Sequence, residues 1–375
     1  MLWILQFKIW LQRIISLRNR RENKREPSIS LQKVHTDESY NEFHEYIDAS
    51  RYLYKLLIEP TQDHIKNKEL IIVPDGILNY ISFDALLMRD VNLERPDYSK
   101  LPYLIKNHKS NIANSMQIYF NMKNRELRGN KQVYAFAPEY TNDLDTNKTA
   151  SYQFLRPLNF STLEVEQIKN YFPSSLFIGE RATKANFVKN AKDASILHLA
   201  MHTFVDDENP MYSKLLFTYD TATQEGLLNT YELLNLELNA ELAVLSACNS
   251  GDGELHKGEG VMSLSSGFQY AGVPAIVMSL WEVNDRFGSM VIANFYKYLS
   301  QGYAKNTALH KAKMEVLKQG NALYAHPYYW SGLSLLGEDA PISFYKRTSY
   351  FYFILIGLLF SLSIFILILW KRRKS

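Results

Sequence analysis

The sequence contains almost no cysteine: of its 375 residues, only Cys248 is one. A single cysteine excludes an intramolecular disulfide framework and a cysteine-rich zinc site, so disulfides say nothing about the compartment. The sequence also lacks a charge bias, because its formal net charge is only +3. We see no basic stripe interleaved with aromatic residues in the body of the chain, and we therefore expect no nucleic-acid partner.

Nucleotide-binding and export signals are missing as well. The segments 137–143 (APEYTND) and 251–260 (GDGELHKGEG) lack the GxGxxG and GxxxxGK spacings, which argues against a nucleotide-binding protein. Residues 1–17 are apolar but are interrupted by Lys8 and Arg13, and no small-residue cleavage site follows, unlike in a signal peptide. We interpret residues 1–37 as an amphipathic helix and a basic linker. Such a helix could lie on a membrane surface, or pack on a partner or an upstream helical repeat.

The hydrophobic run near the C-terminus is long enough to cross a membrane. Residues 349–370 carry no charge, and about 20 apolar residues span the hydrocarbon core of a bilayer. The alternative is a buried core helix. We expect a transmembrane helix here, with a linker at 341–348, a basic tail at 371–375 and the lipid bilayer as a partner. The basic tail favours a cytoplasmic C-terminus, but the missing export signal favours a domain that faces the cytoplasm, and we give the second argument slightly more weight.

Residues 38–340 have the pattern of an α/β domain. Short apolar runs alternate with helical stretches, which predicts a mostly parallel sheet with helices on both faces. A first helix is expected at 38–59. Strands are expected at 69–73, 132–137, 175–178, 195–200, 242–247, 274–280 and 332–336, and later helices at 162–172, 184–191, 259–271, 286–300 and 304–318. Ser161, with Glu164 three residues later, predicts a capping box for the helix at 162–172.

Two of the predicted strands run into reactive residues. His202 follows the strand at 195–200, and Cys248 follows the strand at 242–247. Chemistry in open α/β sheets lies beyond the carboxyl ends of the strands, so neighbouring strands would bring this thiol and this imidazole together. Taken singly, Cys248 could be a buried apolar thiol and His202 a strand-end histidine with a structural partner. His198 lies within its strand, and we assign it a structural role.

The sequence around these residues resembles a known family. The segments 197–217 (LHLAMHTFVDDENPMYSKLLF) and 241–285 (ELAVLSACNSGDGELHKGEGVMSLSSGFQYAGVPAIVMSLWEVND) resemble the CHAT domain, a caspase-like peptidase family of clan CD. The segments 69–87 and 326–338 are similar to the opening and closing strands of that domain. The resemblance covers residues 40–340.

The resemblance implies a caspase–hemoglobinase fold with a Cys–His dyad, in which Cys248 is the nucleophile and His202 is the base. The thiolate would attack a peptide carbonyl to form a thioester, His202 would protonate the leaving amine, and water would complete hydrolysis. This chemistry needs no metal or organic cofactor, and the partner that it implies is a protein substrate.

The resemblance also bears on the oxyanion hole and on specificity. Many members of the clan have glycine after the catalytic histidine, where this chain has Thr203; the backbone N–H groups of Thr203 and Cys248 are the expected oxyanion donors. Glu282 and Asp285 lie in a segment that is similar to the LWDVTD segment of separase, a relative that cuts after arginine. These two acidic residues suggest a P1 pocket for a basic side chain. The alternative is that they are helix N-terminal charges favoured by the helix dipole.

We therefore expect a membrane-anchored cysteine endopeptidase that cuts after a basic P1 residue in a signalling or regulatory pathway. The alternative is an inactive or dormant scaffold on the same fold, which acts through a helical-repeat or activating partner protein.

Overall fold

The structure of the chain is a computed structural model that describes residues 37–93, 95–140, 157–206, 208–220, 223, 225–246, 259–281, 283, 285–319 and 324–343. Among these residues, eight strands form one sheet in the order β1-β2-β11-β10-β9-β5-β3-β4. The strands are β1 (Leu70–Ile72), β2 (Ser110–Ile112), β3 (Val133–Ala137), β4 (Ser174–Ile178), β5 (Ile196–Leu199), β9 (Leu242–Leu245), β10 (Ala275–Ser279) and β11 (Leu333–Gly337).

The sheet is mostly parallel, as the alternation of strands and helices predicts. Within it, β10 and β11 pair antiparallel, and every other neighbouring pair is parallel. Each residue of the central strands β5, β9, β10 and β11 is buried. Continuous apolar strands of this kind are typical of a sheet that is covered on both faces.

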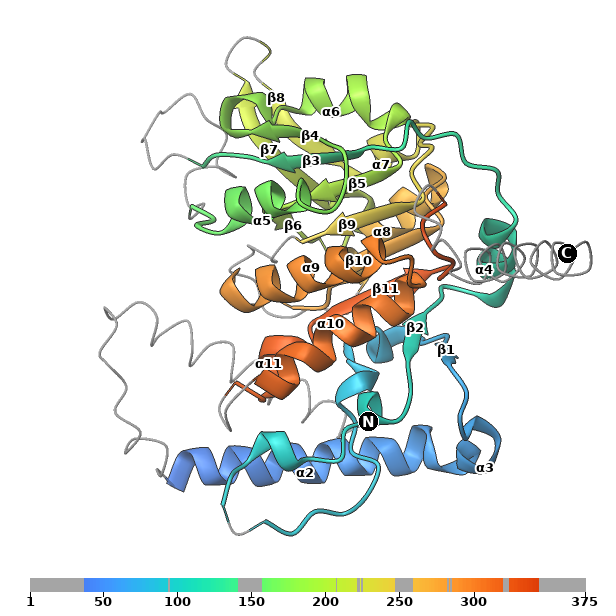
Figure 1. Cartoon of the computed structure of the whole chain (residues 1–375), viewed down its shortest axis with the longest axis vertical. Helices are drawn as coiled ribbons and strands as arrows, with labels where there is room; N and C mark the ends of the chain where they lie inside the picture. The colour runs from blue at the N-terminus through green and yellow to red at the C-terminus, as the bar shows by residue number, and fades with distance from the viewer. Residues whose placement is uncertain are drawn as a thin grey trace, which may run out of the picture.

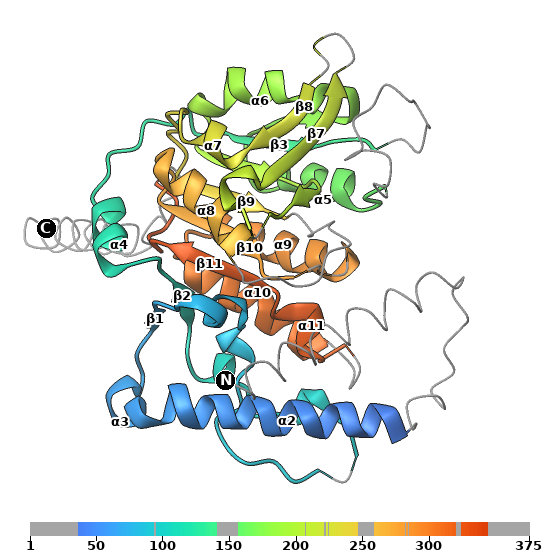
Figure 2. The same ribbon diagram turned by 180° about the vertical axis from the view of Figure 1, so that it is seen from behind.

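Helices cover both faces of the sheet, which confirms the second part of the predicted architecture. In Figure 1, α5 (Ser161–Ile168), α9 (Asp285–Ser300) and α10 (Lys305–Gln319) lie on one face. In Figure 2, α7 (Thr230–Leu233) and α8 (Glu259–Tyr270) lie on the other. The remaining helices are α2 (Asp37–Leu57), α3 (Gln62–Ile65), α4 (Met116–Lys123), α6 (Lys184–Asn190) and α11 (Pro327–Trp330).

Strand β2 and a second, smaller sheet are additions that the apolar pattern does not predict. In the described part of the chain, β6 (Thr203–Phe204), β7 (Lys214–Asp220) and β8 (Glu225–Asn229) form an antiparallel sheet. The chain enters this sheet soon after it leaves β5. The small sheet therefore fixes the backbone at the point where β5 ends.

The capping box predicted for Ser161 and Glu164 is wrong. Phe160 is the N-cap residue of α5 and makes no side-chain cap hydrogen bond, while the Ser161 hydroxyl donates to the carbonyl of Leu158 (3.0 Å). The Glu164 carboxylate instead accepts a hydrogen bond from a ring nitrogen of His198 in β5 (3.0 Å). The Glu164 carboxylate therefore bonds the buried imidazole of His198, and not the backbone at the start of α5 as the local pattern predicts.

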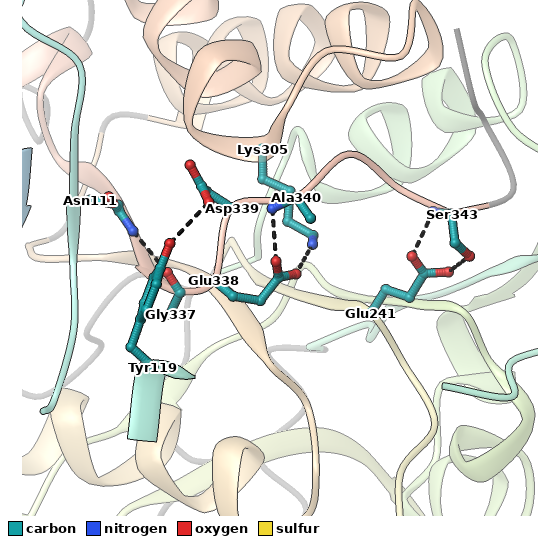
Figure 3. A network of polar contacts seen from close by, with 9 residues as sticks. All are labelled: Asn111, Tyr119, Glu241, Lys305, Gly337, Glu338, Asp339, Ala340 and Ser343. Atoms are coloured by element: carbon teal, nitrogen blue, oxygen red, sulfur yellow. Dashed lines mark hydrogen bonds and ion pairs between the residues drawn. The ribbon is translucent and has the colours of Figure 1, made fainter. Parts of the chain in front are cut away.

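A polar network at the amino end of β9 fixes the last described residues of the chain (Figure 3). Glu241, which precedes β9, accepts hydrogen bonds from the backbone N–H of Ser343 (2.6 Å) and from its hydroxyl. Glu338, which follows β11, pairs with Lys305 and accepts from the N–H of Ala340 (2.7 Å). The segment after β11 is thus held on the domain as far as residue 343.

The predicted segments at the two ends of the chain lie largely outside the described residues. These are residues 1–36 of the N-terminal segment, the linker from 344 onward, the membrane span at 349–370 and the basic tail. Within the residues that are described, no helix has both the length and the apolar character needed to cross a bilayer.

Candidate active site

The two strands that lead to the predicted dyad are neighbours. β5 and β9 pair in parallel, with Leu199 opposite Leu245 at the carboxyl end of the ladder. Positions 202 and 248 both lie three residues beyond this pair. Cys248 is in the segment 247–258, which lies outside the described residues. Its distance from His202 therefore remains a prediction.

His202 is held by Tyr140 and by the small sheet. The residue is buried, and its backbone N–H donates to the Tyr140 hydroxyl (2.9 Å). That hydroxyl donates in turn to the carbonyl of Leu216 (2.5 Å), and the N–H of Leu216 donates to the carbonyl of His202 (3.0 Å). The rings of Tyr140 and His202 also pack against each other, with centroids 4.6 Å apart. Tyr140 was not among the predicted site residues, although its position after β3 at the same edge of the sheet is a signal that could have suggested it.

Thr203, the predicted oxyanion donor, begins β6 and is buried. It lies opposite Leu215 in the antiparallel pair formed by β6 and β7. The pairing fixes the backbone directly after His202, which a donor with a preset direction requires. The second predicted donor, the amide of Cys248, is outside the described residues.

His198, for which we predicted a structural role, is fully buried in β5 between two helices. One ring nitrogen, Nδ1, lies 3.1 Å from the Tyr296 hydroxyl in α9, and the other, Nε2, lies 3.0 Å from Glu164 Oε1 in α5. Burial, and to a lesser degree the Glu164 carboxylate, raises the pKa of Tyr296 well above its usual range. The phenol therefore keeps its proton. The three side chains join α5, β5 and α9.

A pocket opens at the same edge of the sheet. Its volume is about 430 Å³, which includes the mouth that is open to solvent. Ala200, Ser246 and Ser279 line it where β5, β9 and β10 end, and Glu164 and Ser289 line it from α5 and α9. Ser246 lies only two residues before Cys248. A group bound in this pocket would therefore lie beside the backbone that leads to the predicted nucleophile.

The segment after β10, which carries the predicted P1 residues, packs tightly on the start of β11. Trp281 and Val283 are buried, and a Cβ added to Gly332 would lie 2.6 Å from a methyl group of Val283 and 3.0 Å from the Trp281 ring. Only glycine at 332 permits this approach. Asp285 is the first residue of α9, the position that the helix-dipole alternative expects, and Glu282 lies outside the described residues.

No metal site accompanies these residues in the described part of the chain, where no three His, Cys, Asp or Glu side chains are grouped so that they could hold an ion.

The sequence matches the profile of the CHAT domain over residues 48–338. The chain belongs to the CHAT domain family. The match includes β5, β9 and the positions of both predicted dyad residues.

Two curated relatives are tetratricopeptide repeat protein 28 of Homo sapiens and of Mus musculus. The CHAT chain is 26% identical to the human protein and 23% identical to the mouse protein, in each case over 337 residues and 78% of its own length. It spans only 13% of the length of either relative.

Solved structures with similarity to this chain include two cysteine peptidases. For Saccharomyces cerevisiae separase in its complex with securin, the TM-score is 0.40 at 12% identity, covering 64% of this chain and 15% of that one. For the Arg-specific cysteine proteinase gingipain R, the TM-score is 0.42 at 10% identity, covering 80% and 68% of the two chains.

Proposed function

We propose that this CHAT protein is a cysteine endopeptidase with Cys248 as nucleophile and His202 as general base. The observation that supports the proposal most directly is the parallel pairing of β5 and β9, because these strands lead into His202 and Cys248 at one edge of the sheet. The family supports the same chemistry, since a caspase-like peptidase domain is what the sequence resembles.

In the proposed mechanism, His202 accepts the proton of Cys248, or the two rest as a thiolate and an imidazolium. The thiolate attacks the peptide carbonyl, and the oxyanion accepts hydrogen bonds from the Thr203 and Cys248 amides. His202 then protonates the leaving amine, which breaks the peptide bond and leaves a thioester. Water hydrolyses the thioester and returns the enzyme to its resting state.

The test is covalent labelling with an electrophilic peptide probe directed at cysteine. The wild-type chain should be labelled and the Cys248→Ala chain should not, because no other thiol is present. Cys248→Ser keeps nearly the same volume and serves as a control for folding. If Cys248→Ala retains full cleavage of a peptide substrate, the peptidase proposal is wrong. New peptide termini in cells that carry the wild-type chain, but not the Cys248→Ala chain, would identify the substrate.

We also propose that the enzyme prefers a basic P1 residue. The acidic residues Glu282 and Asp285 near the carboxyl end of β10 support this preference, although the dipole of α9 alone would also favour Asp285. A peptide library profiled at P1 should show arginine or lysine. A preference for aspartate or for a large apolar residue would exclude the proposal.

A second candidate function is a scaffold whose caspase-like domain is inactive or dormant. The curated relatives favour this alternative, because they are named as tetratricopeptide repeat proteins, and such repeats are helical binding modules. The electrophilic probe separates the two candidates: a scaffold would leave Cys248 unlabelled, whereas a dormant peptidase would become reactive once its activating partner is added.

We propose in addition that residues 349–370 anchor the domain to a membrane, with the domain on the cytoplasmic side. The uncharged apolar run supports the anchor. Protease added to the outside of intact cells should leave the domain uncut. Digestion of the domain from outside would show that it lies on the other side of the membrane.

A further inference from the structure

Glu164 is a buried carboxylate in the pocket wall, and its partner among the described side chains is a histidine and not a lysine or arginine. Its side chain is only 6% exposed. Among the described residues, it forms an ion pair with no lysine or arginine, and its one side-chain hydrogen bond is to His198. A carboxylate buried in this way is costly unless an opposite charge or further hydrogen bonds stabilise it.

His198 fixes the position of Glu164. Its Nε2 lies 3.0 Å from Glu164 Oε1, and its Nδ1 lies 3.1 Å from the Tyr296 hydroxyl, so the ring is held between α5 and α9. Glu164 is therefore oriented in the pocket wall by one side-chain hydrogen bond.

The pocket in front of Glu164 suits a slender cationic group. Ala200, Ser246 and Ser279, which line it where β5, β9 and β10 end, are small, and its apolar walls are formed by Leu158, Phe160, Val283 and Leu333. The serine hydroxyls can accept hydrogen bonds from an ammonium or guanidinium group, and neither cation accepts any itself. Ser246 connects the pocket with the predicted nucleophile, since only residue 247 separates it from Cys248.

We propose that Glu164 binds the cationic end of a substrate side chain that enters this pocket. The inference rests on the proposed peptidase function and deepens it: Glu164, rather than Asp285 or Glu282, would select a basic P1 residue. The ligand class is a lysine or arginine side chain. Its permanent charge would give Glu164 a partner of a kind that no lysine or arginine supplies among the described residues.

The first test compares two peptides that differ only at P1, one with arginine and one with its neutral isostere citrulline. Glu164→Gln keeps the size of the side chain and an oxygen for His198, but it removes the charge. We expect this variant to lower kcat/KM for the arginine peptide at least tenfold, the order found for buried charge pairs that lose one partner, and to leave the citrulline peptide within about twofold. Glu241→Gln, at the opposite end of β9, should leave the ratio unchanged, and Asp285→Asn tests the competing assignment of the P1 pocket. The reverse result, with the ratio lost in Asp285→Asn and kept in Glu164→Gln, would overturn the inference.

Tyr296→Phe is the matched control for an indirect structural effect. It removes the hydroxyl that contacts His198 but keeps the Glu164 carboxylate. If Glu164 acts through its charge, Tyr296→Phe should preserve the ratio of arginine to citrulline cleavage. Equal loss of the ratio in Tyr296→Phe and Glu164→Gln would show that packing, and not charge, is responsible.

A binding measurement keeps the inference testable if the chain cleaves no peptide. Agmatine, a linear guanidinium compound, is titrated into full-length Cys248→Ala protein in detergent and into the Cys248→Ala, Glu164→Gln double variant. We expect binding to the first to be at least tenfold tighter than to the second. Equal affinities, or no binding to either protein, would refute the role of Glu164, whether or not the peptidase proposal holds.

Discussion

Buried carboxylates lie near the two ends of strand β9, and the number and kind of their partners differ. At the amino end, Glu241 accepts two hydrogen bonds from Ser343, and Glu338 nearby is paired with Lys305 (Figure 3). Asp339, which is only partly buried, accepts a further hydrogen bond from the Tyr119 hydroxyl (3.0 Å). Each of these carboxylates has its partner within the domain itself.

At the carboxyl end of β9, the carboxylate has fewer partners. Glu164 pairs with His198 through one hydrogen bond, has no lysine or arginine partner among the described residues, and lines a pocket. His202 follows β5 at this same end, and Cys248 follows β9 in the sequence. The comparison suggests a division of roles. Polar groups at the amino end of β9 stabilise the fold. Those at its carboxyl end are held in place and can still bind a ligand.

Lys305→Ala should disrupt the polar network at the amino end of β9, and we expect it to have the largest effect on stability. The Lys305 side chain is 1% exposed, and its removal leaves the Glu338 carboxylate, 7% exposed, without its ion-pair partner. Loss of one member of a buried pair costs about 3 to 5 kcal/mol. Urea unfolding followed by circular dichroism would measure it. Lys297→Ala is the control, since its pair with Glu315 is partly exposed and should contribute about 1 kcal/mol or less. Equal losses in the two variants would contradict the role of the buried pair.

His202→Ala should have the next largest effect, and on turnover instead of on stability. We expect kcat/KM to fall about a hundredfold, the usual contribution of a general base, which corresponds to about 2.7 kcal/mol. His198→Ala, within β5, should mainly lower stability because it leaves Glu164 and Tyr296 without their shared partner. If His198→Ala abolishes turnover in folded protein and His202→Ala does not, the two roles are reversed.

The core of the sheet could be predicted because it depends on local pattern. Strands such as β5 and β9 are short and apolar except for His198, so their positions and a mostly parallel sheet follow from the sequence. That β5 and β9 are neighbours is shown only by the structure. The smaller sheet could not be predicted in this way. β6 has only two residues, and β7 has its register shifted between Leu216 and Asp220, so neither gives a regular alternation.

The candidate site was only half predictable, for a related reason. His202 and Cys248 stand out because each follows a buried strand. Glu164 does not, because the nearby Ser161 makes it look like a helix-capping residue, and its partner His198 is 34 residues away in the sequence. Packing of α5 on β5 brings these two together. α5 also ends at Ile168, earlier than predicted, because a turn follows it.

Two truncations should test how much residues 341–343, at the amino end of β9, contribute to stability. We expect an effect of intermediate size. A chain that ends after residue 347 keeps Ile342, which is fully buried, and Ser343, so its melting temperature should match that of the full-length chain. A chain that ends after residue 340 loses both and should be less stable by about 2 kcal/mol, the scale for burying one large aliphatic side chain. The first truncation should also release the protein from the membrane fraction. Equal melting temperatures for the two truncations would show that 341–343 contribute nothing.

The smallest effect on stability, and the sharpest contrast, should come from replacing glutamate by glutamine at each end of β9. Glu241→Gln removes a charge that accepts two hydrogen bonds from Ser343. Hydrogen bonds to a charged group are stronger than those to a neutral amide, so we expect a loss of about 1 kcal/mol and no change in turnover.

Glu164→Gln removes a charge that accepts a single side-chain hydrogen bond, and the amide oxygen can still accept that bond from His198 Nε2. Neutralising a buried carboxylate of this kind relieves a desolvation cost, so stability should stay the same or rise by up to about 1 kcal/mol. Selectivity for arginine over citrulline should fall in this variant alone. Residues that serve a ligand often lower stability, and a gain in stability together with a loss of selectivity is the pattern expected for them. Both variants can be measured by urea unfolding and with the same two peptides. Destabilisation of similar size at the two edges would mean that Glu164 is a structural carboxylate like Glu241, and the contrast between the two ends of β9 would no longer hold.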